Sequence, residues 1–186
     1  MQRGFSLTEV LVAMALLTTI TAGVAQMMTI AGARNLAARH QVLTSALATQ
    51  KMEQIRALTF AYDVNGIPLT DFTTNVAACV TDASGAGLGA SPSNALDADH
   101  AGFVDYLDAR GACLGAGASP PAGAIYTRRW AIVPLESDPA NALVVSVLVT
   151  LTAAEHTRPP GSPRQRRPED ALLATMRTRN AAADDE

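Results

Sequence analysis

The longest apolar run of the chain lies near its N-terminus. No charged residue occurs from Val10 to Ala33, and about 20 predominantly apolar residues are enough to cross a bilayer. Residues 34–59 continue without Gly or Pro, and apolar side chains recur there at helical spacing. The two stretches predict one helix from Phe5 to about Thr59, roughly 80 Å long at the α-helical rise. Its second half carries one apolar stripe, formed by Leu36, Leu43, Leu47 and Leu58 with Ile55 on its margin.

A different periodicity marks the C-terminal part of the chain. Residues 143–152 alternate between apolar and polar positions, as in a half-buried antiparallel strand, and residues 126–133 are rich in β-forming side chains. Residues 171–178 can be interpreted in two ways. The preceding Pro168-Glu169-Asp170 is typical of a helix start, whereas apolar residues at every second position favour a strand. The pattern alone leaves both interpretations open for this segment. The long helix and the strands together predict an α+β fold for the whole chain.

The stretch between helix and sheet, residues 60–124, is rich in Gly, Ala and Ser. It predicts a variable connection in which residues 103–107 form a short ordered piece. Both cysteines of the chain, Cys79 and Cys113, lie in it. In an oxidising compartment an even pair most simply forms one disulfide, and two free thiols are the alternative.

The residues at the start of the long helix resemble a known processing signal. Residues 3–13, RGFSLTEVLVA, are similar to the class III signal of type IV prepilins and of type II secretion pseudopilins. In that pattern a short basic leader ends in Gly, and Phe and Glu follow as the first and fifth mature residues. The resemblance implies that a prepilin peptidase cuts between Gly4 and Phe5 and that the new Phe5 amine is N-methylated. It also implies that Glu9 pairs with the N-terminal amine of a neighbouring subunit.

Physical chemistry is consistent with that role for Glu9. A carboxylate inside an apolar helix carries a free-energy cost in the membrane, and an ammonium partner relieves it. Two plainer interpretations exist: the Glu9 side chain reaches the membrane interface and has no partner, or the helix is only a signal anchor. Thr8 departs from the family pattern, in which that position is more often aliphatic.

The resemblance implies a pilin fold, in which the C-terminal half of a long helix packs on a small antiparallel sheet. That fold ends in a closing strand, so we predict a strand at residues 171–178. Residues 50–58, QKMEQIRAL, also look like the helix end of PilV-type minor pilins, the type IV pilus modification proteins. The expected segments are a cleaved leader at 1–4, a transmembrane and assembly helix at 5–33, an amphipathic continuation at 34–59, a variable connection at 60–124, an antiparallel sheet at 125–179 and a flexible tail at 180–186.

By the same resemblance, the protein is a minor pilin that takes part in pilus assembly or priming. Its partners are then other pilin subunits, the inner-membrane assembly machinery, the prepilin peptidase and, before assembly, membrane lipid. The C-terminal domain is expected in the periplasm and later in a pilus at the cell surface. The alternatives are a minor pseudopilin of a type II secretion system and a membrane-anchored periplasmic binding module.

Other clusters of chemically active residues point to no cofactor, metal or catalytic centre. The acidic stretch Asp97–His100, with Asp105 and Asp108, is expected to be a solvated loop, and calcium binding is the weaker alternative because the EF-hand spacing is absent. The basic run 158–168 predicts a solvated loop, and contact with DNA phosphates is the weaker alternative. The net charge of −3 gives no indication of nucleic-acid binding. No nucleophile or metal-protease motif accompanies the histidines. Trp130 is expected in the core.

Overall fold

The computed structural model describes residues 6–77, 86–156 and 166–180. Its first element is helix α1 (Leu7–Arg56), close to the predicted bounds. By length and composition, this helix holds a stretch that can cross a membrane. The chain divides into two compact units, Met1–Arg39 and His40–Glu186. The second unit therefore contains the C-terminal part of α1.

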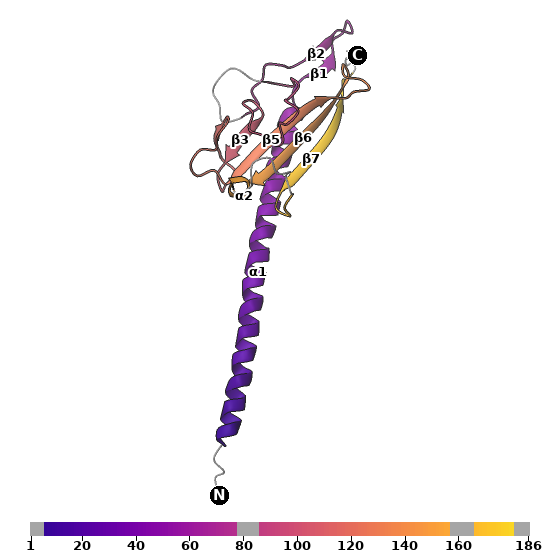
Figure 1. Cartoon of the computed structure of the whole chain (residues 1–186). Helices are drawn as coiled ribbons and strands as arrows, with labels where there is room; N and C mark the ends of the chain where they lie inside the picture. The colour runs from indigo at the N-terminus through magenta and orange to yellow at the C-terminus, as the bar shows by residue number, and fades with distance from the viewer. Residues whose placement is uncertain (1–5, 78–85, 157–165, 181–186) are drawn as a thin grey trace. The chain divides into compact units, whose positions relative to one another are not determined.

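The strands of the second unit form two antiparallel sheets (Figure 1). The small sheet pairs β1 (Phe60–Tyr62) with β2 (Pro68–Thr70). The large sheet has the strand order β4-β3-β5-β6-β7. Its elements are β3 (Val104–Leu107), β4 (Cys113–Ala116), β5 (Tyr126–Pro134), β6 (Ala142–Leu151) and β7 (Ala171–Thr178), and the short helix α2 (Thr152–His156) follows β6.

The core lies between the C-terminal part of α1 and one face of the large sheet. The register pairs Trp130 with Val147 and Ile132 with Val145, so these four fully buried side chains share that face. Leu47, Met52 and Ile55 of α1 are buried in the same cluster, where each apolar side chain contributes about 1.5–3 kcal/mol. The predicted α+β fold, in which a long helix packs on an antiparallel sheet, is confirmed.

The buried face of α1 differs from the predicted stripe. Leu36 is 57% exposed, and Ile55, predicted at the margin, is fully buried. Two polar residues, Thr44 and Lys51, are fully buried on this face. In the second unit, α1 packs on the sheet through polar as well as apolar positions. A stripe defined by apolar residues alone does not include the polar ones.

The sheet also uses residues predicted as connection. The predicted ordered piece at 103–107 is β3, which pairs with β5, and β4 adds a further strand at the edge. With four residues each, these strands are too short to give a clear alternation. Residues 171–178 form a strand, as the resemblance to pilins implied, and pairing with β6 covers one edge of β7 along its full length.

Candidate functional site

The first turn of α1 contains the residue that the sequence singles out, Glu9. The Ser6 backbone N–H donates to Glu9 Oε2 at 3.1 Å, and the Thr8 N–H donates to Ser6 Oγ at 3.3 Å. This arrangement is a capping box, in which the two side chains satisfy backbone donors at the helix start. The Ser-x-x-Glu signal was present in the sequence but was not recognised there. Gly4 and Phe5 lie outside the described residues, so cleavage and N-methylation stay predictions.

The surface that follows Glu9 along α1 is apolar and exposed. Large side chains between Leu7 and Ile30 are all 48% exposed or more. Glu9 is the one charged residue from Leu7 to Ala33. The exposed apolar side chains of this stretch are suited to lipid or to neighbouring helices, and a carboxylate among them carries a free-energy cost unless it is paired or reaches the membrane interface. This stretch of α1 is therefore the candidate assembly site.

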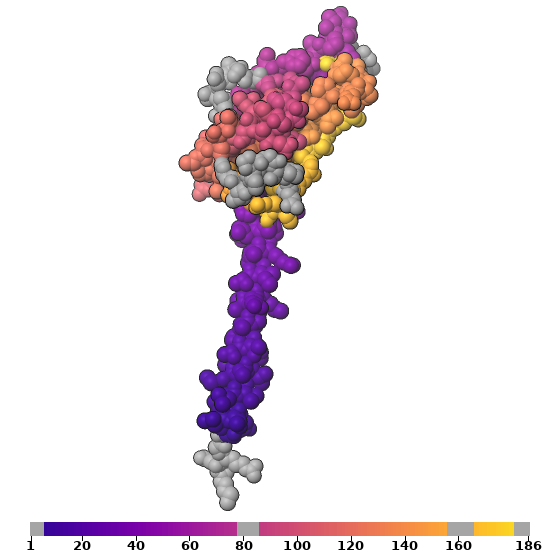
Figure 2. Space-filling model, in the orientation of Figure 1, coloured from indigo at the N-terminus to yellow at the C-terminus, as the bar shows by residue number. Residues whose placement is uncertain are grey.

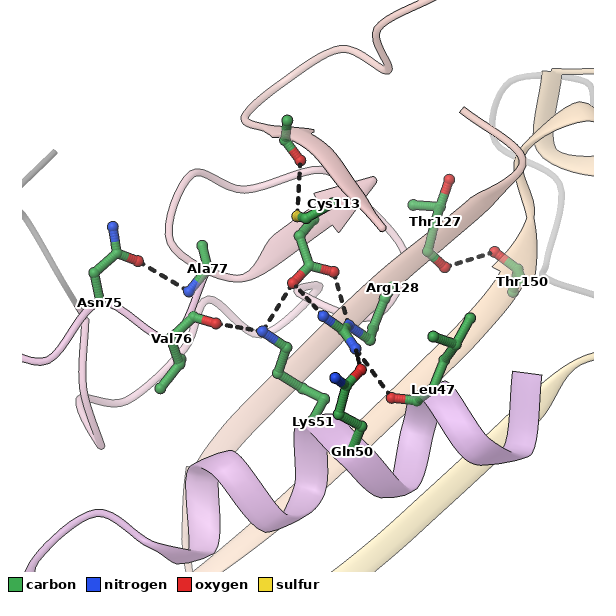
Figure 3. A network of polar contacts seen from close by, with 12 residues as sticks. Leu47, Gln50, Lys51, Asn75, Val76, Ala77, Cys113, Thr127, Arg128 and Thr150 are labelled. Carbon is green, nitrogen blue, oxygen red and sulfur yellow. Dashed lines mark hydrogen bonds and ion pairs between the residues drawn. The ribbon is translucent and has the colours of Figure 1, made fainter. Parts of the chain in front are cut away.

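A second set of polar residues holds the C-terminal part of α1 on the sheet (Figure 3). Lys51 of α1 and Arg128 of β5 both contact the Asp105 carboxylate of β3. The Lys51 Nζ lies 2.8 Å from Asp105 Oδ2, and Arg128 makes two bonds to the same carboxylate, at 2.8 and 2.9 Å. All three side chains are buried. The contacts join one helix and two strands that are far apart in the sequence.

Both cations make further contacts. Lys51 Nζ donates to the Val76 carbonyl and lies 4.4 Å from the centre of the Trp130 ring. Arg128 donates to the Leu47 carbonyl and the Gln50 side chain, each at 3.1 Å. Two cations share one carboxylate, so the cluster has a net positive charge in a buried place. Burial lowers the pKa of Lys51 to about 8; Asp105 opposes this shift and Arg128 adds to it.

The opposite face of the large sheet carries a second ionic cluster around Arg129. Its guanidinium bonds to Asp99 at 2.7 Å and to Glu155 of α2 at 2.8 Å. Asp97, Thr127 and other residues line a polar cavity at this place. Hydrogen bonds and charge attraction from Glu155 and Asp99 raise the pKa of Arg129, although its burial acts in the opposite direction. The cluster fixes α2 against β5.

The expectation of a solvated acidic loop at 97–108 is wrong for two of its residues. Asp105 is fully buried in the Lys51 cluster, and Asp99 bonds to the buried Arg129. The basic residues of β5 that pair with them were visible in the sequence, but their pairing depends on strand register. Within residues 6–77, 86–156 and 166–180, no three His, Cys, Asp or Glu side chains are grouped to hold a metal ion.

Other predicted residues are found as follows. Trp130 lies in the core, as expected. Cys113 is half-buried at the start of β4, while Cys79 lies outside the described residues, so their disulfide stays a prediction. Of the basic run, Arg166 and Arg167 are exposed and residues 158–165 are not described. His40 Nδ1 bonds to the Tyr126 hydroxyl at 2.7 Å, and His100 bonds to Asn94.

Comparison with known proteins adds one finding. The family model described as the prokaryotic N-terminal methylation motif matches residues 1–25. No significant match was found among curated proteins or among solved structures. The matched segment contains Gly4, Phe5 and Glu9 and the first part of α1.

Proposed function

We propose that this chain, which the methylation motif and the long apolar helix indicate to be a type IV pilin-like or pseudopilin-like protein, is a minor pilin. Its role is that of a structural subunit in the assembly or priming of a type IV pilus. The observation that carries the proposal is Glu9, a single carboxylate on an exposed apolar helix within the matched segment. A methylated Phe5 amine of a neighbouring subunit supplies the charge that this position requires.

The proposal gives the two units different tasks. The apolar part of α1 anchors the subunit in the inner membrane and then packs among the helices of the fibre. The second unit lies in the periplasm before assembly and at the fibre surface afterwards. A prepilin peptidase acts on the chain first, and other pilin subunits and the inner-membrane assembly machinery are its later partners.

Glu9→Gln tests the proposed role of the carboxylate. Gln at this position can still accept the Ser6 N–H in the capping box, but it cannot neutralise an ammonium. We expect normal cleavage and membrane insertion, and a drop of more than about tenfold in the amount recruited into sheared fibres, because breaking a buried charge pair costs at least 2 kcal/mol. Immunoblots of the fibre and membrane fractions give both quantities.

Glu53→Gln is the matched control, because Glu53 lies on the same helix and forms only an exposed ion pair with Arg56. It should leave recruitment unchanged. Wild-type recruitment of Glu9→Gln would overturn the assigned role of Glu9. Recovery of the processed chain only with a secretion apparatus, and never with pili, would assign it to the pseudopilins instead.

A further inference from the structure

One edge of the large sheet has backbone groups available for another strand. The Arg179 N–H donates to the Asn141 carbonyl at 2.8 Å, in the same register that pairs Thr178 with Ala142. Bonded positions alternate along an antiparallel strand, so odd-numbered residues of β7 bond to β6. The backbone groups of Leu172, Ala174 and Met176 therefore point away from β6. We call these three positions the outer edge of β7.

The two edges of this sheet are built differently. At the other edge, β4 has four residues, its register shifts beside Leu107, and Pro121 packs closely against Gly115. Short strands, irregular register and proline are the means by which natural proteins block strand addition. β7 has eight residues in unbroken register and contains no Pro, Gly or Lys. Its one charged side chain, Arg177, is directed to carbonyls at the end of α1.

At one end of the outer edge, just beyond β7, another strand already bonds to the chain. Just beyond β7, the Asn180 carbonyl accepts the Tyr62 N–H at 2.9 Å, and the Asn180 N–H donates to the Phe60 carbonyl at 3.2 Å. β1 is therefore bridged in a parallel sense to the chain that leaves β7. Within the part of the chain that the structure describes, no segment occupies the rest of this edge, beside residues 172–176. Figure 2 shows β7 at the molecular surface along one side of the sheet.

The side chains beside this edge define what the added strand must look like. The register places Val133, Val144 and Met176 in one row across the outer face of the sheet. Val133 is 48% and Met176 61% exposed, and Ala174 beside them is exposed as well. An added strand would cover part of this row if its alternate residues were apolar. The outer edge carries no charged side chain that would favour a charged partner.

We propose that a neighbouring subunit of the fibre adds an extended, uncharged segment of about five residues to the outer edge of β7. The inference rests on the proposed function for its partner.

Hydrogen exchange of the full mature chain tests the proposal. We compare residues 171–178 in sheared fibres with the same residues in the detergent-solubilised monomer. We expect the outer-edge amides to exchange at least tenfold more slowly in fibres, because an added strand bonds them. Residues 113–116 at the blocked edge should exchange equally in both samples. Equal exchange at residues 171–178 in fibres that contain the chain overturns this proposal alone, whereas absence of the chain from fibres overturns the proposed function with it.

A variant pair at one position adds a second readout. Ala174→Pro removes an outward N–H that β6 does not use, whereas Ala174→Val keeps that N–H. We expect Ala174→Pro to lower recruitment into fibres at least tenfold and Ala174→Val to leave it unchanged. If Ala174→Pro fails to fold in a thermal melt, Met176→Lys takes its place, because it puts a charge beside the edge and keeps the backbone intact. Wild-type recruitment of a folded blocking variant overturns the proposal.

Discussion

At the scale of single residues, the chain places charges in apolar surroundings in two ways. Asp105 is buried, but Lys51 and Arg128 bond to it within the folded unit. Glu9 lies on an exposed apolar helix, and its carboxylate meets one backbone N–H of its own first turn. The first arrangement is complete in the single chain, whereas the second leaves the carboxylate without a charged partner among the described residues. This contrast links Asp105 with stability and is consistent with the assembly role proposed for Glu9.

Asp105→Asn should be strongly destabilising. The substitution leaves Lys51 and Arg128 as two buried cations without a carboxylate, and breaking a buried ion pair in this way costs about 3–5 kcal/mol. Denaturant unfolding of the detergent-solubilised protein measures the loss. Glu53→Gln removes an exposed ion pair of the same helix and should cost about 0–1 kcal/mol. Equal, small losses in the two variants would show that the buried cluster does not hold α1 on the sheet.

The titration of Lys51 should make the free energy of unfolding depend on pH in the alkaline range. Burial lowers its pKa from 10.5 to about 8, so between these values the unfolded chain binds more protons than the folded chain. The free energy of unfolding should therefore rise as the pH increases through this window. Lys51→Met lacks the titrating group, and the difference between the two curves isolates its contribution. Parallel curves for the wild type and the variant would contradict the lowered pKa.

At the scale of elements, α1 is stabilised separately at three places. The capping box closes its first turn, and the Lys51 cluster ties its C-terminal part to β3 and β5. Arg177 of β7 donates to the Ile55 carbonyl at 3.1 Å and to the Leu58 carbonyl. Cations at a helix C-terminus satisfy carbonyls that lack intrahelical partners and interact favourably with the helix dipole. Arg177 of β7 thereby caps the C-terminal end of α1.

Arg177→Met tests this link between β7 and α1. The variant keeps a long apolar side chain but removes two charge-assisted hydrogen bonds, so we expect a loss of about 1–3 kcal/mol. Amide exchange of Ala57 and Leu58 should become faster as the last turn frays. Arg56→Met, which removes an exposed cation on the same turn, serves as the comparison and should change little. Unchanged exchange in Arg177→Met would mean that the helix end is fixed by packing alone.

The sequence predicts the elements whose signal is continuous over many residues. The long helix and the alternating strand β6 were found in this way. For β7 the alternation and the preceding helix-start signal disagreed, and only the family resemblance favoured the strand. β3 was predicted only as a short ordered piece, and β4 was not separated from the connection, because four residues give little periodicity. The Lys51 cluster was not predicted because its three members lie on different elements, and only helix docking and strand register bring them together. The importance of Glu9 came from a local motif, which requires no tertiary structure.

At the scale of the whole molecule, the same chain contains a unit with its own buried core and a helix whose apolar side chains are exposed. The second unit has a closed apolar core and two buried ionic clusters. The first part of α1 has exposed apolar side chains and lies within the segment matched by the methylation motif. This division is what a subunit needs if it waits in a membrane and is then transferred into a fibre.

The central claim is that the chain is processed as a prepilin and incorporated into a pilus. Mass spectrometry of the N-terminal peptide, from fibres sheared off the native cells, tests it most directly. The account predicts a peptide that begins at N-methylated Phe5 and is enriched with the pili. An intact Met1, or a chain that is absent from the fibres, would contradict it.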